Sequence, residues 1–159
     1  MILVLLGTQN NSFVRLLEEV EKNIDNGNIT EEVIVQAGYT KYHSNKMKIY
    51  NLISSQEMEK LVNAANLVIS HGGVGSILQC VKKNKIVIGI PRQKKYKEHV
   101  NDHQKQLIKS FSELGYIIGV EDVNELEQAL EKAKYFKPKI LKSNTENIIN
   151  LIENYIEKN

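Results

Sequence analysis

The stretch LVISHGGVGS, residues 67–76, decides the fold. Its first residues are apolar up to Ser70 and predict a short buried strand. Glycines follow at once, and a helical pattern then runs from about Gly75 to Lys83. A buried strand that passes through a glycine turn into a helix is typical of one strand-helix unit in a parallel sheet.

The same unit recurs along the whole chain. Apolar runs predict further strands at residues 2–6, 33–36, 47–50, 86–90 and 116–118. Helical spacing of apolar residues predicts helices at about 14–23, 54–65, 107–115, 123–130 and 143–158. This alternation predicts an α/β fold with a doubly wound, Rossmann-like, mostly parallel sheet. No linker or repeat divides residues 1–159, so we expect one domain.

Composition narrows the classes of function. The net charge of +2 is too small to indicate nucleic-acid binding. Cys80 is the single cysteine, which excludes an internal disulfide and a multi-cysteine zinc site and fits a reducing cytoplasm. No apolar run approaches the roughly 20 residues of a membrane helix. We therefore expect any membrane association to come through a partner or a surface patch.

Ligands of doubly wound sheets bind at the carboxyl ends of the strands, so the loops there are the candidate site. The first loop runs from Gly7, Thr8 and Gln9 to Ser12, ahead of a helix. Its small and amide residues leave backbone N–H groups free to meet phosphate oxygens. The alternative is a tight polar turn in which Ser12 caps the helix.

The second loop contains His71, Gly72, Gly73, Gly75 and Ser76. Glycines let a ligand approach the backbone closely, and the following helix presents its positive end. Gln79 lies one turn into that helix, where its amide suits a ribose diol. The alternative is a sharp turn with a solvated Gln79. The chain contains neither a P-loop motif nor a complete dinucleotide fingerprint, so ATPases and NAD enzymes are disfavoured.

The third loop spans residues 91–104 and begins with basic residues, Arg92 among them, which suit a diphosphate. Its later part carries His99, Asn101, Asp102 and Gln104, which suit sugar hydroxyls. The alternative is a solvated basic loop. His99 and His103 have a spacing that fits zinc, but no third ligand is evident, so we expect no metal.

Several motifs together resemble a known family. They are Gly7-Thr8 with Phe13 and Arg15-Leu16, Gln36-x-Gly38-Tyr39, residues 70–76, and residues 91–104 with PRQKK and EHVNDHQ. They resemble the C-terminal domain of glycosyltransferase family 28. Members similar to this chain are bacterial capsular and exopolysaccharide transferase subunits, the cytosolic catalytic subunit of the eukaryotic N-glycosylation UDP-GlcNAc transferase, and the peptidoglycan lipid-linked GlcNAc transferase.

The resemblance implies one half of a two-part, GT-B-type enzyme. This half would bind a UDP-sugar, and a membrane-associated subunit would bind a lipid-linked saccharide acceptor. The enzyme would be inverting, independent of metals and cofactors, and held at the inner face of the membrane through its partner. The apolar stripe of the terminal helix, at about 143–158, would either belong to the core of this domain or dock on that partner.

Two departures from the family pattern bear on activity. Relatives often carry His where this chain has Gln9, and an acidic residue is common where Gln79 stands. A carboxylate would grip a ribose diol more strongly than an amide does. His71 is a candidate base, although the base can belong to the partner. The alternatives are a non-catalytic activator of the partner and, less favoured, a UDP-sugar epimerase.

Overall fold

The computed structural model describes residues 1–99, 101–141 and 150, and its elements alternate along the chain. The strands are β1 (Ile2–Leu5), β2 (Val33–Gln36), β3 (Lys48–Tyr50), β4 (Leu67–Ser70), β5 (Val87–Gly89) and β6 (Ile118–Gly119). The α-helices are α1 (Val14–Asp25), α2 (Ser55–Ala64), α3 (Val74–Lys82), α4 (His103–Glu113) and α5 (Leu126–Ala133). Short 3₁₀ helices, η1 (Lys94–Tyr96) and η2 (Val123–Glu125), precede α4 and α5.

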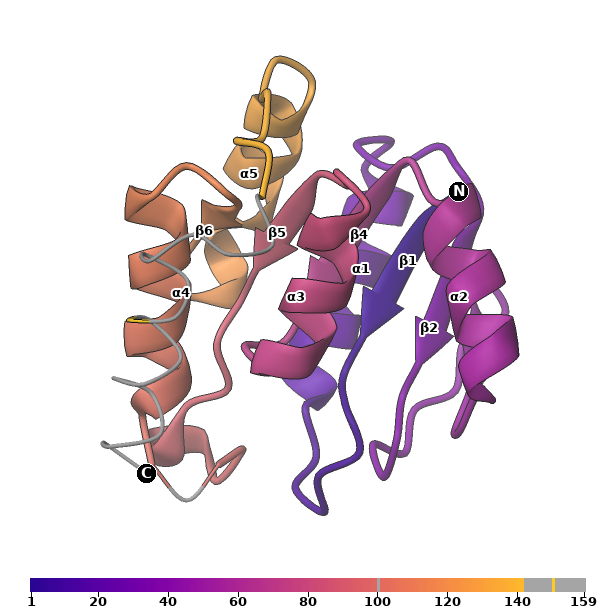
Figure 1. Cartoon of the computed structure of the whole chain (residues 1–159). Helices are drawn as coiled ribbons and strands as arrows, with labels where there is room; N and C mark the ends of the chain where they lie inside the picture. Colours follow the sequence, from indigo (N-terminus) through magenta and orange to yellow (C-terminus); the bar gives the residue numbers. More distant parts are fainter. Residues whose placement is uncertain (100, 142–149, 151–159) are drawn as a thin grey trace.

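The strands form one parallel sheet in the order β3-β2-β1-β4-β5-β6. Because every strand points the same way, all carboxyl ends lie on one edge, at the bottom of Figure 1. The chain winds outward from β1 to β3, then crosses to β4 on the other side of β1. The predicted doubly wound, Rossmann-like fold is confirmed.

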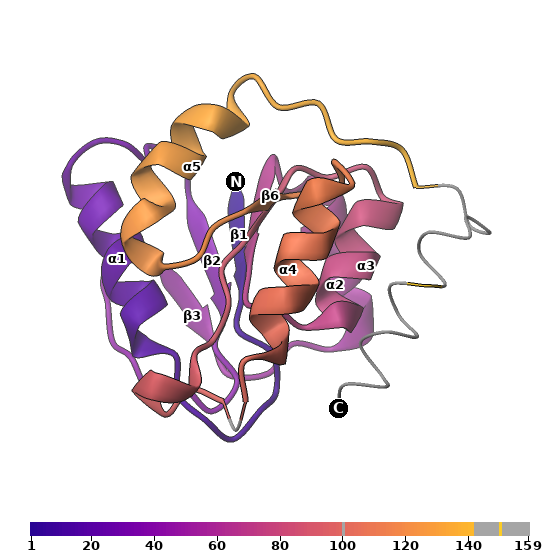
Figure 2. The ribbon, with the colours of Figure 1, turned by 90° about the vertical axis from the view of Figure 1, so that its left-hand side faces the viewer.

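Helices cover both faces of the sheet (Figure 2). Helices α1 and α5 pack on one face, where alternate strand residues such as Val4, Val35 and Ile69 point into a buried cluster. Helices α2, α3 and α4 cover the other face over Leu3, Val68 and their neighbours. Strands buried on both faces explain the continuous apolar runs of the sequence.

The predicted strands and helices within the described residues are all present, with small differences at their ends. The last strand begins at Ile118, later than the predicted 116–118, because the Tyr116 N–H still bonds to the Phe111 carbonyl of α4, at 3.1 Å. Ser54 caps α2 as expected, its hydroxyl accepting a hydrogen bond from the Glu57 N–H. The helix predicted at 143–158 falls outside the described residues, apart from residue 150.

Within that described part, no helix combines the length and the apolar character that a membrane span requires.

Candidate functional site at the carboxyl edge of the sheet

The first two candidate loops are neighbours in space. They follow β1 and β4, which pair directly, with Leu5 opposite Ser70. The winding direction reverses between these two strands, so the loops flank the switch point where doubly wound sheets bind ligands. The expectation that the glycine turns lie at adjacent strand ends is confirmed.

The first loop is held in place by the last residue of β2 and by the segment that follows it. The Gln36 side chain accepts a hydrogen bond from the Gly7 N–H at 3.2 Å and donates one to the Gly7 carbonyl at 3.0 Å. Gly38 allows this closeness, since a Cβ there would stand 2.2 Å from the Gly7 oxygen. The Thr40 hydroxyl accepts from the Phe13 N–H at 3.0 Å. The Gln36-x-Gly38 motif is thus a brace for the loop.

The braced loop leaves part of its surface exposed. Thr8 is exposed and Gln9 is half-buried, so both are accessible to a ligand at this edge. Helix α1 begins after Phe13 without a side-chain cap. Ser12 is therefore not the cap of this helix, and that alternative is wrong.

The imidazole of His71 occupies the space between the two glycine turns. A Cβ added at Gly7 would stand 2.5 Å from the ring, and one added at Gly73 would stand 2.7 Å from it. A Cβ at Gly72 would meet the Gln104 side chain at 2.7 Å, whereas Gly75 has nothing within 4 Å. We expected these glycines to make room for a ligand. At residues 7, 72 and 73 they make room for the protein's own side chains, and Gly75 alone faces open space.

His71 is a poor candidate for the catalytic base. Its side chain is 3% exposed, and its Nδ1 has no hydrogen-bond partner among the described residues. Burial, with smaller contributions from Arg92 and His99, lowers the pKa of His71 to about 3. A base with so low a pKa removes a proton weakly at neutral pH. In this structure His71 packs between the two glycine turns, and its role as a base stays a prediction.

The amino end of α3 is the open part of the second loop. Gly73 precedes the helix and provides no side-chain cap, and no acidic residue occupies the first turn. The N–H groups of Val74, Gly75 and Ser76 have no carbonyl partner within the helix, so they carry its positive end. Gln79 is half-buried one turn further along. The arrangement suits an anion with a hydroxyl-bearing group next to it.

Arg92 is placed differently from the prediction. Its guanidinium is 1% exposed and donates to the backbone carbonyls of Leu6, Asn11 and Glu98 at 2.5, 2.6 and 3.2 Å. Burial lowers the pKa of Arg92 to about 10, so the group stays charged at neutral pH. In this structure Arg92 ties the first loop to the third and presents no charge to a diphosphate.

Glu98 holds the third loop onto α1. Its carboxylate, itself buried, accepts two hydrogen bonds from Arg15, at 2.7 and 2.9 Å, and one from the Gln93 N–H at 3.0 Å. Arg15 also reaches Asp122 at 3.1 Å and stacks over the Tyr96 ring at 3.7 Å. Arg92 and Glu98, which belong to the family motifs of this loop, therefore act mainly to fix the shape of the loop.

The remaining residues of the third loop divide into accessible and buried groups. His99 lies half-buried with its Nε2 3.1 Å from the Gln9 amide, which joins the first and third loops. Its Nδ1 accepts from the Asn101 N–H at 3.3 Å, which places the proton of the neutral ring on Nε2. The contact with Gln9 is then a hydrogen bond when the Gln9 amide turns its oxygen toward that proton. Burial is the main cause that lowers the pKa of His99.

Asp102 is exposed and accepts from the Lys94 N–H, and Asn101 accepts from the His103 N–H, both at 3.0 Å. Gln104 is fully buried beneath Gly72, and its Oε1 accepts from the Arg92 N–H at 3.3 Å. His99, Asn101 and Asp102 are therefore accessible to a ligand, whereas Gln104 is not in this structure.

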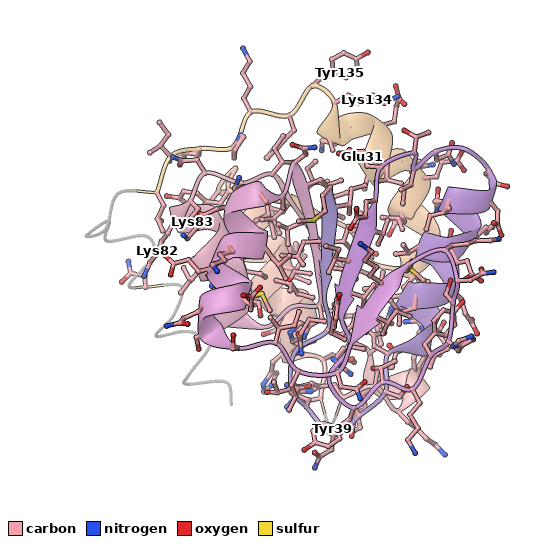
Figure 3. The ribbon with its side chains drawn as sticks, turned by 90° about the vertical axis from the view of Figure 1, so that its right-hand side faces the viewer. Glu31, Tyr39, Lys82, Lys83, Lys134 and Tyr135 are labelled. Atoms are coloured by element: carbon pink, nitrogen blue, oxygen red, sulfur yellow. The ribbon has the colours of Figure 1, made fainter. Side chains whose placement is uncertain are left out.

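Sequence reasoning missed an apolar patch beside the first loop. Tyr39, Tyr50 and Leu52 are 62%, 49% and 71% exposed, and Tyr39 projects from the carboxyl edge in Figure 3. The Gly38 N–H donates to the Asn51 carbonyl at 2.8 Å, which sets the Tyr39 and Leu52 segments side by side. In a sequence, apolar residues at or near the ends of short strands have the same pattern as core residues. No sequence signal therefore predicts that these three side chains are exposed.

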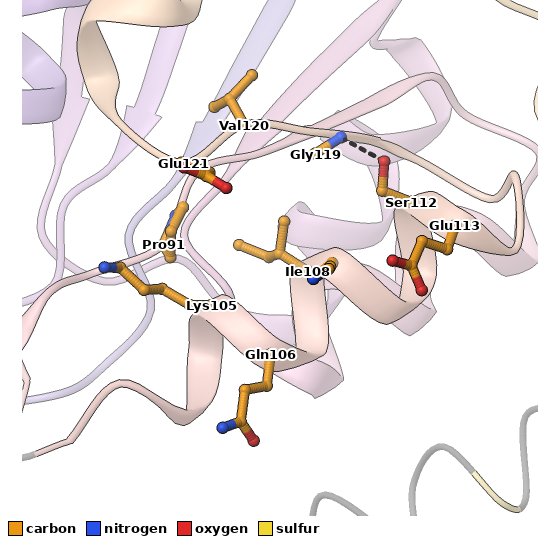
Figure 4. Close-up of a pocket in the computed structure, with 10 residues that line it drawn as sticks. Pro91, Lys105, Gln106, Ile108, Ser112, Glu113, Gly119, Val120 and Glu121 are labelled. Atoms are coloured by element: carbon orange, nitrogen blue, oxygen red, sulfur yellow. Dashed lines mark hydrogen bonds between the residues drawn. The ribbon is translucent and has the colours of Figure 1, made fainter.

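A cavity of about 340 Å³ lies elsewhere, between α4 and the segment that contains β6 (Figure 4). Ile108 and Val120 lie on opposite sides of it, and the Ser112 hydroxyl accepts from the Gly119 N–H at 3.2 Å. Pro91, at the start of the third loop, lines this cavity, but none of the predicted ligand-binding residues does. The candidate site is instead the exposed surface across the three loops.

His99 and His103 are not joined by further metal-ligating side chains. Across residues 1–99, 101–141 and 150, no group of three or more His, Cys, Asp or Glu side chains is arranged to hold a metal ion.

The parallel sheet, with candidate loops on both sides of its switch point, defines the class of fold: a doubly wound, Rossmann-like α/β domain. Residues 1–158 match the glycosyltransferase family 28 C-terminal domain, and the chain belongs to that family.

Two curated relatives illustrate the similarity. The chain is 31% identical over 91 residues to the UDP-N-acetylglucosamine transferase subunit ALG13 of Candida albicans, covering 57% of this chain and 29% of that protein. It is 29% identical over 133 residues to the UDP-N-acetylglucosamine–N-acetylmuramyl-(pentapeptide) pyrophosphoryl-undecaprenol N-acetylglucosamine transferase of Clostridium botulinum, covering 84% of this chain and 33% of that protein. The matched regions thus make up about a third of either relative.

Solved structures confirm the fold. The solution structure of ALG13 has a TM-score of 0.58 at 20% identity, with 94% of this chain and 93% of that one covered. The calicheamicin glycosyltransferase CalG4 has a TM-score of 0.60 at 13% identity, with 99% of this chain and 43% of that one covered.

Proposed function

We propose that this chain is the UDP-sugar-binding half of an inverting glycosyltransferase. The observation that carries the proposal is the open amino end of α3, where Gly75 has free space around it beside the braced Gly7 loop. Bare N–H groups at a helix end form an anion site, and its position at the switch point suits a diphosphate. The similarity to UDP-N-acetylglucosamine transferases favours UDP over other nucleotides.

The accessible residues divide by the part of the donor that they would contact. Thr8, the Gly75 and Ser76 N–H groups and the Ser76 hydroxyl would meet the diphosphate. Gln79 would bind the ribose, and His99, Asn101 and Asp102 would line the sugar side together with Gln9. The exposed faces of Tyr39 and Leu52 offer apolar surface to the uracil ring. Gly7, Gly72, Gly73, His71, Arg92 and Gln104 would shape the site from beneath.

The acceptor half would belong to another protein. The curated relatives include a transferase of a lipid-linked substrate and a transferase subunit. We therefore propose a membrane-associated partner that binds a lipid-linked saccharide, with sugar transfer at the cleft between the two. A role in capsule or exopolysaccharide synthesis is part of the same proposal.

A second candidate is a nucleotide-binding activator that leaves catalysis to its partner. The burial of His71, whose pKa is about 3, favours it, because the one histidine in the glycine turns is a weak base. Sugar transfer by the chain and its partner, reconstituted together, separates the candidates. Turnover that falls with Gln79→Ala or His99→Ala supports the donor role, and unchanged turnover supports the activator.

The direct test of nucleotide binding is the melting temperature of the full chain with UDP, UMP, ADP and inorganic pyrophosphate. Ligands that bind the native state raise its stability, so UDP should give the largest shift. UMP should give less, because it lacks the second phosphate. Equal shifts with ADP and UDP, or no shift with either, would overturn the proposal.

A further inference from the structure

The third loop carries an exposed basic turn that the proposed donor site does not use. It consists of Lys94, Lys95, Tyr96 and Lys97, all exposed, at η1 (Figure 2, lower left). None of its ammonium groups forms an ion pair with a carboxylate among the described residues. The Lys95 ammonium lies 4.9 Å from the centroid of the Tyr96 ring.

The turn is held rigidly at its base. Glu98 is buried and forms an ion pair with Arg15. The Arg15 guanidinium also stacks over the Tyr96 ring, 3.7 Å from its centroid. The Glu98 N–H donates to the Gln93 carbonyl at 3.2 Å and closes the turn. Asp102 is the exposed carboxylate at the base, where it accepts from the Lys94 backbone N–H. Glu98 is thus buried and paired with Arg15, whereas the three lysines are exposed.

Exposed lysines around an exposed tyrosine are the residues that proteins use at an anionic membrane surface. Lysine ammonium groups are attracted to anionic lipid headgroups, and tyrosine rings favour the headgroup region of a bilayer. We propose that the basic turn binds anionic phospholipid headgroups directly. The contact lies at the same edge as the donor site, and it would hold that edge toward the membrane independently of sugar transfer.

The test is co-sedimentation of the full chain with vesicles at low salt. The chain should bind vesicles that contain phosphatidylglycerol and not vesicles of pure phosphatidylcholine. Each lysine near the surface should contribute about five-fold in affinity, so the triple variant Lys94→Gln/Lys95→Gln/Lys97→Gln should lose about 100-fold. Binding should also weaken with added salt, because ions screen the attraction.

The chain provides a matched control at its opposite edge. Lys132, Lys134 and Lys137 are exposed and surround Tyr135, which is 80% exposed, and Figure 3 shows Lys134 and Tyr135 at the far end from Tyr39. The triple variant Lys132→Gln/Lys134→Gln/Lys137→Gln should bind as the wild type does, because Glu131 pairs with Lys134 and reduces the positive charge at that end. Equal losses in both variants, no loss in the first, or no binding to anionic vesicles would overturn the proposal.

A competition experiment distinguishes binding to a lipid surface from binding to a small phosphate ligand. Excess inorganic pyrophosphate or UDP should leave the chain on the vesicles at matched ionic strength. Full release by either would show that the lysines bind a small phosphate ligand, which would contradict the proposal. Circular dichroism of each variant verifies that the fold is retained.

Discussion

The ring of His71 stands against Gly7, so close that a Cβ on residue 7 would lie 2.5 Å from Nε2. Gly7 also has a φ of +75°, which a residue with a side chain adopts at a cost. The first glycine turn is therefore fixed by a packing requirement inside the protein. Its contribution to ligand binding is indirect, because it sets where the loop lies.

Gly7→Ala and Gly75→Ala should differ sharply in stability. Gly7→Ala adds a clash with His71 to an unfavourable φ and should lower the free energy of unfolding by about 2 kcal/mol or more. Gly75→Ala places a methyl group in open space within α3 and should leave stability unchanged or raise it by about 0.5 kcal/mol. Urea denaturation measures both, and an equal loss in the two variants would contradict the packing account.

The buried His71 should make stability dependent on pH. Its pKa is about 3 in the folded chain, below the ordinary value of 6.5, so the unfolded chain binds the proton more tightly. The contribution is fully present above pH 6.5 and is lost as the pH falls toward 3. At pH 5 the wild type should have lost about 2 kcal/mol from this group. His71→Asn should show a weaker fall between pH 7.5 and 5 in urea denaturation, and an identical fall would contradict the assignment.

Much of the fold was predictable from the sequence, because each buried parallel strand is a continuous apolar run that ends in glycine or a polar residue. The pairing of β1 with β4, which brings the Gly7 and Gly73 turns together, follows from the usual winding of such sheets. The roles of individual polar residues did not follow. The sequence predicted ligand-binding or solvated roles for Arg92, Glu98 and Gln104. A sequence does not reveal which polar side chains are buried and hydrogen-bonded.

Removing the buried charge of Glu98 should loosen the third loop. Its carboxylate is 4% exposed and Arg15 is 23% exposed, so Glu98→Gln leaves a partly buried guanidinium with a weaker partner. We expect a loss of about 2 kcal/mol in the free energy of unfolding. Glu131→Gln, which removes the exposed partner of Lys134, is the control and should leave the urea midpoint unchanged. If both variants unfold alike, the Arg15–Glu98 pair does not support the loop.

Gln79→Glu should tighten UDP binding. A carboxylate accepts charge-assisted hydrogen bonds from the ribose hydroxyls, which are stronger than those of an amide. We expect affinity to rise by about three- to ten-fold and to fall in Gln79→Ala. Titration calorimetry measures all three proteins. Weaker binding by Gln79→Glu would indicate that this side chain lies near the diphosphate and not near the ribose.

Binding of the diphosphate at the open amino end of α3 calls for a variant that changes this end without disturbing the fold. Gly73→Asp is a poor test, because its Cβ would strike His71 at 2.7 Å. Gly75→Asp avoids that clash, and an acidic residue in the first helical turn favours the helix. Asn84→Asp adds the same charge at the opposite, exposed end of α3.

The decisive measurement is the dissociation constant of UDP for the wild type, Gly75→Asp and Asn84→Asp by titration calorimetry. We predict that Gly75→Asp keeps its melting temperature and loses UDP binding, whereas Asn84→Asp binds as the wild type does. UDP binding by Gly75→Asp with unchanged affinity would show that the diphosphate lies elsewhere.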